Sequence, residues 1–318
     1  MLSNTITIQS FAKVNLSLDV KGVLDNGYHI VEMVMQQISL HDDVTVTWTD
    51  GSTPLDISLA TTRSDLPNDT GNLAYRAAQL MADTCPEIGG ALDIHIDKRI
   101  PVAAGMAGGS SNCAAVIHGI NQLWNLGLSV SQMNNLGATL GSDVPFCIMG
   151  QAAASSEIRD IFADDPMACH CALATGTGTN LVPVTGLDAF IALTKPPIAV
   201  STAEVYKGMD SLQIPEHPDN GALIRALEEH RDDDVYVNMI NVLENYTLKV
   251  YPSVMYAKDK IKSLYSNGPV LMSGSGPTVF GLFDDKMVAE RACEALRESH
   301  LARTVFLTTV FNNGGTRR

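Results

Sequence analysis

Apolar and polar residues alternate at the start of the chain, which is the pattern of a β-strand with one buried face. Between residues 5 and 20 six apolar side chains occupy even positions, at Ile6, Ile8, Val14, Leu16, Leu18 and Val20. Lys13 and Asn15 therefore fall on the opposite face of the predicted strand. Residues 44–48 and 92–96 repeat the alternation, so we expect two further strands there.

Helical spacing appears in three stretches of the first half. Residues 70–83 place Leu73, Ala77 and Leu80 on one face, and the stretch after residue 112 carries an apolar stripe at Val116, Ile120, Leu123 and Trp124. Ser129 and Gln132 form a capping-box pattern that predicts the start of a third helix. We expect this helix to stop at Gly141 and a loop to follow at Ser142–Phe146.

The second half mixes short strands with polar helices. We expect a strand at 189–193, a helix at 220–230, and a strand, glycine turn and strand across 270–280. A helix at 286–299 and a last strand at 304–310 follow, before a polar tail. Because the order lacks the regular βαβ repeat of a doubly wound sheet, it predicts an α+β fold with two layered domains.

Composition and charge exclude several classes of protein. The chain has 318 residues, of which 45% are hydrophobic and 18% charged, so it can bury a full core. Its formal net charge of −14 argues against a nucleic-acid partner, because binding a phosphate backbone requires a basic face. A small anionic ligand stays possible, since backbone N–H groups can hold a phosphate in an acidic protein.

The cysteines and the N-terminus favour a cytoplasmic protein that does not enter a membrane. Six cysteines are scattered along the chain, and only Cys169–Cys171, with His170 between them, form a cluster. One C-x-C pair with a single histidine lacks a second ligand pair, so we expect no metal site there. We find neither a signal-peptide pattern nor a run of the ~20 apolar residues that a membrane span needs.

A glycine-rich loop precedes the second predicted helix. The run Gly105–Ser111 contains three glycines and two serines, and glycines allow a backbone to approach a ligand closely. The first N–H groups of a helix have no internal partner and favour anions. The order differs from both the Walker A and the dinucleotide-binding patterns, so either a phosphate site or a plain strand–helix turn with a serine cap explains the loop.

Three motifs in this order resemble the GHMP kinases, the family of galactokinase, homoserine kinase and mevalonate kinase. They are Lys13–Leu16 on the first strand, the glycine–serine loop, and Ser273–Pro277 near the C-terminus. Finer motifs at 26–29, 141–146 and 197–206 resemble the branch that phosphorylates 4-diphosphocytidyl-2-C-methyl-D-erythritol. The resemblance spans nearly the whole chain.

The resemblance implies a two-domain GHMP kinase fold with its active-site cleft between the domains. We expect an N-terminal domain at 1–153, an inserted surface segment at 154–171 with a short helix at 156–163, and a C-terminal domain at 172–318. Ala107 stands where the family commonly has glycine, and an alanine fits there only if its φ is negative.

The resemblance also implies the site residues. Asp143 would face the attacking hydroxyl as base or orienting acceptor, and Lys13 would stabilise charge on the transferred phosphoryl group. The substrate-binding residues would be Asn15, Tyr28, His29, Pro197, Val200, Ser201 and Thr202. The ATP-binding residues would be Pro101, Val102, Ala103, Ala104, Gly105, Met106, Ala107, Gly108, Gly109, Ser110, Ser111 and Asn112. Lys98 and Arg99 either offset phosphate repulsion or form a solvated charge pair.

The implied reaction moves the γ-phosphoryl group of ATP, with Mg²⁺, to the 2-hydroxyl of a cytidine diphosphate conjugate in non-mevalonate isoprenoid precursor biosynthesis. The resemblance implies a small-molecule substrate and a monomer or homodimer. Two alternatives stay open: a GHMP kinase of the homoserine or mevalonate type, and a non-catalytic nucleotide-binding relative. The Ala107 change and the inserted segment at 154–171 favour the latter, whereas intact Lys13 and Asp143 argue against it.

Overall fold

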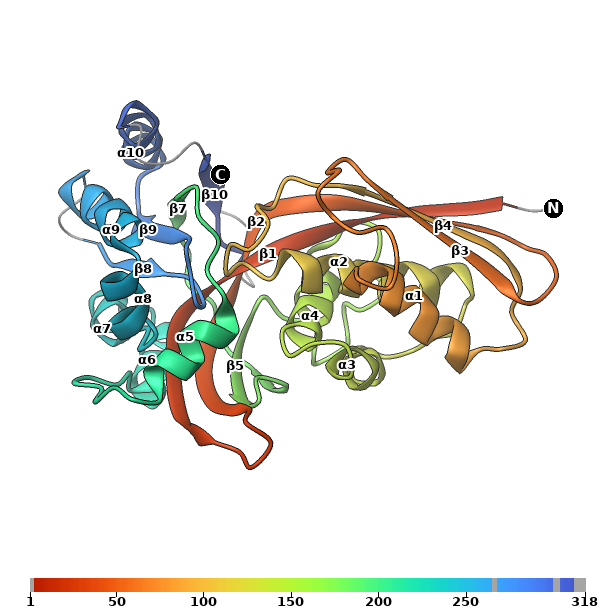
Figure 1. Ribbon diagram of the computed structural model, residues 1–318, viewed down its shortest axis with the longest axis horizontal. Coiled ribbons are helices and arrows are strands. Elements are labelled where there is room, and N and C mark those ends of the chain that lie inside the picture. The colour runs from red at the N-terminus through yellow and green to blue at the C-terminus, as the bar shows by residue number, and fades with distance from the viewer. Residues whose placement is uncertain (1–2, 265–267, 300–303, 312–318) are drawn as a thin grey trace. The chain divides into compact units, whose positions relative to one another are not determined.

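The computed structural model describes residues 3–264, 268–299 and 304–311, and the chain divides into two compact units (Figure 1). The first unit contains Met1–Ala12, Leu40–Ile100 and Ala107–His170. The second contains Lys13–Ser39, Pro101–Met106 and Cys171–Arg318. Two long strands, β1 (Ser3–Val23) and β2 (His29–Thr49), contribute residues to both units.

In the residues that the structure describes, a sheet and four helices make up the first unit. The second half of β2 pairs antiparallel with β4 (Gly90–Asp97), and β4 pairs parallel with β3 (Leu55–Thr61). Four helices lie on one face of these strands (Figure 1): α1 (Leu73–Thr84), α2 (Gly108–Leu123), α3 (Val130–Ala138) and α4 (Val144–Ala154). Every second residue of β4, at Leu92, Ile94 and Ile96, is buried, as the alternation predicts.

Local signals explain where these helices begin. Ser129 and Gln132 form the predicted capping box of α3. The predicted loop at Ser142–Phe146 is wrong beyond Asp143, because α4 already begins at Val144. Pro145 lies in the first turn of α4, where a missing N–H costs nothing, and the apolar residues that follow are buried on all sides.

The segment after α4 differs from its prediction. Residues 155–170 form turns, and the expected helix at 156–163 is absent from them. Ile158, Phe162 and Cys169 are buried, and the ring of Phe162 lies 5.5 Å from that of His118. The segment is therefore anchored in the first unit by apolar side chains. Burial among them lowers the pKa of His118 to about 4, so this imidazole is neutral.

The second unit holds another sheet, with strand order β10-β7-β9-β8 and antiparallel neighbours throughout. Its strands are β7 (Phe190–Lys195), β8 (Val270–Met272), β9 (Val279–Phe283) and β10 (Thr304–Thr309). The first half of β2 pairs with β5 (Cys171–Gly176), which pairs with β6 (Asn180–Pro183). The predicted strands at 189–193 and 304–310 are confirmed to within a few residues, whereas the polar tail lies outside the described residues from 312 onward.

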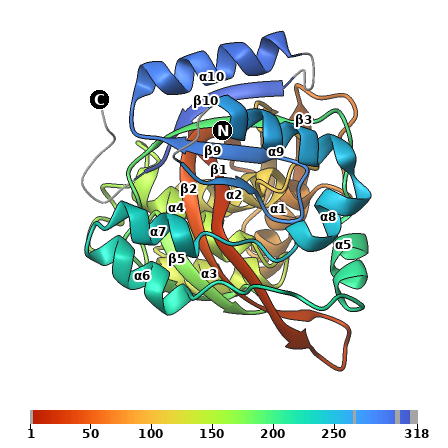
Figure 2. The same ribbon diagram turned by 90° about the vertical axis from the view of Figure 1, so that its left-hand side faces the viewer.

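Six helices complete the described part of the second unit, and two of them, α9 and α10, pack on the β10-β7-β9-β8 sheet (Figure 2). They are α5 (Thr202–Met209), α6 (Asn220–Glu228), α7 (Asp232–Asn238), α8 (Glu244–Val250), α9 (Pro252–Leu264) and α10 (Lys286–Glu298). The helices predicted at 220–230 and 286–299 correspond to α6 and α10. Strand β9 is buried along its whole length, because α9 and α10 also contact it.

Strand β1 departs from its predicted single buried face. All residues from Ser10 to Asp19 are buried, including Lys13 and Asn15 on the face expected to be polar. A buried lysine and asparagine require hydrogen-bonding partners. Their burial is the first structural sign that this stretch of β1 belongs to a site.

The entry into α2 has an unusual backbone. Ala107 occupies the N-cap position with φ 57°, in the left-handed region, and α2 has no side-chain cap. The expectation that Ala107 has a negative φ is therefore wrong. Gly105 has φ 70°, and a Cβ there would lie 2.2 Å from the carbonyl oxygen of Ser273, so only glycine fits.

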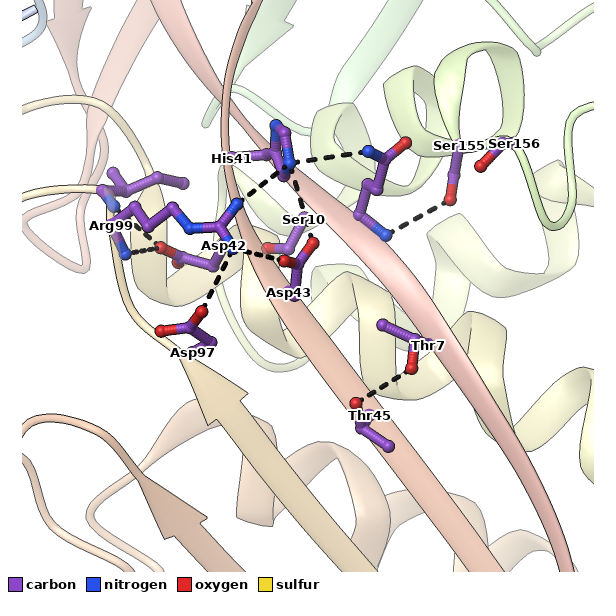
Figure 3. Close-up of polar contacts among 12 residues, drawn as sticks. Thr7, Ser10, His41, Asp42, Asp43, Thr45, Asp97, Arg99, Ser155 and Ser156 are labelled. Atoms are coloured by element: carbon purple, nitrogen blue, oxygen red, sulfur yellow. Dashed lines mark hydrogen bonds and ion pairs between the residues drawn. The ribbon is translucent and has the colours of Figure 1, made fainter.

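A buried carboxylate fixes the start of α2. Asp42, which is fully buried, accepts hydrogen bonds from Lys98 Nζ (2.5 Å), Asn112 Nδ2 (2.8 Å), and the backbone N–H groups of Arg99 (2.6 Å) and Ile100 (2.7 Å). Figure 3 shows Asp42 beside Arg99 and Ser10. The adjacent Asp43 binds the Arg99 guanidinium at the surface instead. Asp42 therefore joins β2, the segment that leaves β4, and α2.

The left-handed Ala107 predicts a gain in stability on substitution. Ala107→Gly removes the clash of the Cβ in this region and should raise the free energy of unfolding by about 0.5–1 kcal/mol, measured by urea unfolding. Ala222→Gly, in the first turn of α6, is the control and should lower it by up to about 1 kcal/mol. A lower free energy of unfolding in both variants would contradict the conformation described for Ala107.

The Asp42 cluster predicts a large loss of stability when the charge of Asp42 is removed. Asp42→Asn leaves the Lys98 ammonium, whose side chain is 4% exposed, without its counter-ion. We expect the free energy of unfolding to fall by about 3–5 kcal/mol in urea titrations, and part of it to return in the double variant with Lys98→Met. Asp43→Asn, the matched surface control, should cost less than about 1 kcal/mol. Equal losses for the two single variants would refute the assignment.

Candidate functional site

The predicted ATP-binding residues divide between the two units. Residues 107–112 belong to the first unit, where they open α2. The first N–H groups of α2, at Gly108, Gly109 and Ser110, have no acceptor within the helix, and no side chain caps them. The positive end of the helix dipole acts at the same point. This end of α2 can therefore bind an anionic group through its backbone.

Ser111 is buried, and its hydroxyl is used inside the first unit. The Ser111 hydroxyl donates to the carbonyl oxygen of Phe11 (2.6 Å) and lies within hydrogen-bonding distance of Ser10 Oγ (2.9 Å) and Gln151 Nε2 (3.0 Å). Ser110, one residue earlier, is only half-buried. Ser111 therefore holds the first turn of α2, while Ser110, in the same turn, stays partly accessible.

Asn112 and Lys98 belong to the Asp42 cluster. Asn112 donates to Asp42 and to Ser10 Oγ (2.9 Å), and its Oδ1 accepts from Lys98 Nζ at 3.0 Å. The alternative that Lys98 is solvated is wrong, because its side chain is almost fully buried. A Cβ at Gly108 would lie only 3.2 Å from Lys98 Nζ. The ammonium therefore lies directly beside the first residue of α2.

Asp143 also lies in the first unit, at the N-terminus of α4. It is half-buried, its φ is −85°, and its side chain does not cap the helix that follows. Helix α4 packs against α2 and α3. The carboxylate is therefore held at the end of a packed helix, but it does not accept a hydrogen bond from the first N–H groups of that helix.

The second unit brings together residues from all three predicted motifs. Asn15 Oδ1 accepts from Lys13 Nζ (2.8 Å) and from the backbone N–H of Gly274 (3.0 Å). The backbone N–H of Lys13 donates to the carbonyl oxygen of Met106 (3.2 Å). Ser273 Oγ donates to the carbonyl oxygen of Gly105 (2.9 Å), so the C-terminal glycine turn packs against the glycine–serine loop as expected.

Thr202, a predicted substrate-binding residue, joins this group through a hydrogen bond between its Oγ1 and Ser275 Oγ (2.9 Å). The neighbouring predictions have other surroundings. Ser201 caps α5 by accepting from the N–H of Glu204, Val200 is buried, and Pro197 is exposed. The hydrogen bond of Thr202 therefore links the start of α5 to the Ser273–Pro277 turn.

Tyr28 and His29 lie where β2 begins, and they differ in exposure to solvent. The side chain of Tyr28 is 60% exposed, whereas that of His29 is 12% exposed and its Nε2 lies 2.6 Å from Asp210 Oδ1. The rings of His29 and Tyr206 are 4.8 Å apart and tilted by 41°. No motif in the sequence marks Asp210 as a partner of His29, and Tyr206 appears there only as the last residue of the motif at 197–206.

The cysteine cluster shows no metal-binding arrangement. Within residues 3–264, 268–299 and 304–311, no group of three or more His, Cys, Asp or Glu side chains is placed to hold a metal ion. Burial lowers the pKa of His170 to about 4 and raises the pKa of the Cys113 thiol in α2 to about 12. None of the helices in the described part of the chain has the length and apolar character needed to cross a bilayer.

Comparison with known families and structures agrees with this arrangement. The family described as GHMP kinases N terminal domain matches residues 72–151, and GHMP kinases C terminal matches residues 213–301. A solved 4-(cytidine 5'-diphospho)-2C-methyl-D-erythritol kinase is 28% identical, with a TM-score of 0.75 over 97% of this chain and 100% of that chain. Mevalonate kinase of L. major shares the fold at 14% identity, with a TM-score of 0.70 over 98% of this chain and 97% of that chain.

Two curated relatives are more similar in sequence, and both are named 4-diphosphocytidyl-2-C-methyl-D-erythritol kinase. The protein of Alkaliphilus oremlandii is 40% identical over 317 residues, which cover 98% of each chain. The protein of Geobacillus thermodenitrificans is 41% identical over 293 residues, which cover 92% of this chain and 93% of the relative. The chain therefore belongs to the GHMP kinases and, within them, to the family of the 4-diphosphocytidyl-2-C-methyl-D-erythritol kinases.

Proposed function

We propose that the protein transfers the γ-phosphoryl group of ATP to the 2-hydroxyl of 4-diphosphocytidyl-2-C-methyl-D-erythritol, a step in isoprenoid precursor biosynthesis. The observation that carries this proposal is the junction in the second unit, where Asn15 joins Lys13 to Gly274. It fixes a lysine ammonium through an amide that is itself bound to the C-terminal glycine turn, which suits a reaction that depends on positioning and charge stabilisation.

The triphosphate is bound mainly by backbone groups. The N–H groups of Gly108, Gly109 and Ser110 and the dipole of α2 attract phosphate oxygens. Lys98 adds positive charge beside Gly108. Ser111 and Asn112 act indirectly, by fixing the first turn of α2 through buried hydrogen bonds. The remaining loop residues, 101–106, complete the ATP-binding segment.

Two charged side chains serve the chemical step. The Lys13 ammonium stabilises the negative charge on the transferring phosphoryl group, and Asn15 holds it in place. Asp143 accepts a hydrogen bond from the attacking hydroxyl and takes up its proton as the new P–O bond forms. The protein forms no covalent bond to the phosphoryl group in this kind of transfer and acts mainly by positioning. Orientation of the hydroxyl by Asp143 therefore contributes more to the rate than early proton abstraction.

Mg²⁺ is the metal ion that ATP normally carries, and it prefers oxygen ligands from substrate phosphates and one or two side chains. The Ser110 hydroxyl is an oxygen donor of this kind, in the first turn of α2, whereas Asp143 is assigned to the attacking hydroxyl. Together with phosphate oxygens of the substrate this donor fits the ion, and Ser110 would hold it. When bound, the ion neutralises phosphate charge.

The nucleobase is recognised by the group around His29. His29 hydrogen-bonds the edge of the cytosine, and Tyr28 frames the base, with the ring of Tyr206 against His29. Thr202 lies in the same unit and approaches the conjugate from the Ser275 side. Pro197, Val200 and Ser201 shape the surrounding backbone.

We further propose that the protein acts in the cytoplasm as a monomer or homodimer, without a nucleic-acid partner. The net charge of −14 opposes binding to a phosphate backbone. The six cysteines are buried thiols, which suits a reducing compartment. Residues 1–153 and 172–318 remain our domain assignment, with 154–171 as an insertion.

Direct assay tests the activity. Purified protein with Mg-ATP should form ADP and a phosphorylated conjugate from the cytidine substrate, but turn over neither homoserine nor mevalonate. Lys13→Ala and Asp143→Ala should each lower kcat by about 10²–10⁴-fold, with little change in the KM for ATP, because both act on the transferring group.

Two surface variants control for general damage. Lys286→Ala, on α10, and Asp160→Ala, in the turns after α4, remove the same charges from exposed positions. Both should keep the wild-type kcat. Wild-type rates in Lys13→Ala or Asp143→Ala would remove that residue from the mechanism, and turnover of homoserine or mevalonate in preference to the conjugate would reassign the substrate.

Substitution of His29 separates the two substrates. His29→Ala should raise the KM for the cytidine conjugate by about 10–100-fold and leave the KM for ATP unchanged, since a lost hydrogen bond to the base affects only the conjugate. His95→Ala, an exposed histidine on β4, is the matched control. An equal rise in both KM values for His29→Ala would contradict its role in base recognition.

A further inference from the structure

The contact between His29 and Asp210 is not explained by the proposed chemistry. Asp210 follows the last residue of α5, at its C-cap, and Val205 and Met209 bury the inner face of this helix. The anchored helix therefore fixes the backbone position of Asp210. Its Oδ1 lies 2.6 Å from His29 Nε2. The ring of Tyr206, on the same helix, restricts the plane of the imidazole.

The contact determines which imidazole nitrogen carries the hydrogen. An ionised carboxylate only accepts hydrogen bonds, so His29 Nε2 must be the donor. In the neutral imidazole the other nitrogen, Nδ1, then has a lone pair and acts as an acceptor. Within the described part of the chain, no hydrogen bond to His29 Nδ1 is formed. Nδ1 is thus available as an acceptor for a ligand.

We propose that Asp210 is a positioning residue that makes His29 select an amino group over a carbonyl on the pyrimidine base. This inference rests on the proposed function. Cytosine carries an exocyclic amine, which donates a hydrogen bond to the Nδ1 lone pair, whereas uracil has a carbonyl oxygen at the same position. With uracil, two lone pairs face each other and neither group is satisfied.

Burial of the imidazole makes this mismatch effective. The side chain of His29 is only 12% exposed, so water cannot readily replace the missing hydrogen bond. The side chain of Asp210 is 45% exposed, and its carboxylate contacts His29 at Nε2. Asp210 therefore controls the proton of His29 through Nε2 and leaves Nδ1, the other ring nitrogen, for the ligand.

Measurements of base preference test the proposal. We compare kcat/KM for the cytidine diphosphate conjugate with that for its uridine counterpart in wild type, Asp210→Asn and Asp210→Ala. The preference for cytidine should fall by ~10-fold or more in Asp210→Ala, chiefly through KM, because Nδ1 can then carry the hydrogen. Asp210→Asn keeps an acceptor oxygen and should be intermediate. The KM for ATP should not change.

The control variant removes a carboxylate from the same helix. Glu204, on α5, is exposed and accepts a hydrogen bond from the Tyr251 hydroxyl. It takes no part in the contacts of His29 with Asp210 and with Tyr206. Glu204→Gln should keep the wild-type base preference. An equal fall in Glu204→Gln and Asp210→Ala would mean that the charge of α5 matters and not the His29 contact, which overturns the proposal.

A spectroscopic readout separates positioning from folding. The ¹⁵N chemical shifts of labelled His29 report which ring nitrogen is protonated. At neutral pH they should show the Nε2–H tautomer in wild type and a mixture of tautomers in Asp210→Ala. A wild-type spectrum with hydrogen on Nδ1, or the same tautomer in both proteins, would refute the proposal.

Direct binding distinguishes failure of this inference from failure of the proposed function. CDP and UDP are titrated by calorimetry against wild type and Asp210→Ala, without turnover. If the wild type phosphorylates the conjugate but both proteins prefer CDP equally, Asp210 has no role and the proposed function stands. If the wild type does not phosphorylate the conjugate, the proposed function fails, and a preference for CDP that Asp210→Ala loses still supports the role of Asp210.

Discussion

The buried carboxylate of Asp42 is the interaction on which the anion-binding end of α2 depends. It binds the Lys98 ammonium, the Asn112 amide and two successive backbone N–H groups, so every acceptor position on its oxygens is used. A buried charge is tolerated only when it is paired and fully hydrogen-bonded. Because these donors come from separate segments, the requirement of one carboxylate orders all of them together. The glycines of α2 can then present their N–H groups from a fixed position.

The two buried lysines show how the same side chain is adapted to different purposes. Lys98 is paired with a carboxylate, so its charge is largely compensated and serves to hold the structure. The Lys13 ammonium donates a hydrogen bond to the amide oxygen of Asn15, and this bond helps to fix where the ammonium lies. Asn15 keeps the geometry by also accepting from Gly274. An aspartate at position 15 would give a stronger pair but would weaken the electrostatic effect of Lys13 on a phosphoryl group.

Local signals in the sequence were sufficient to predict helices and strands, but they did not predict which distant side chains pair with one another. The capping box of α3, the stripe of α2 and the alternation in β4 depend on neighbours in sequence, and each is confirmed. Asp42 lies 56 residues from Lys98, and His29 lies 181 residues from Asp210. No periodicity links positions so far apart, and an exposed aspartate looks the same in sequence as one that orients a histidine. The left-handed φ of Ala107 was also hidden, because that conformation is rare for alanine.

Local binding must also overcome the charge of the whole chain. A net charge of −14 repels a triphosphate and a diphosphate conjugate at long range. This repulsion is screened by salt over about 8 Å under physiological conditions, whereas hydrogen bonds to the N–H groups of α2 act at contact. The lysines at positions 13 and 98 are buried, so their fields pass through a medium of lower polarity than water and are felt more strongly nearby. An acidic protein can therefore bind two polyanions, provided that its few positive groups are concentrated where the phosphates lie.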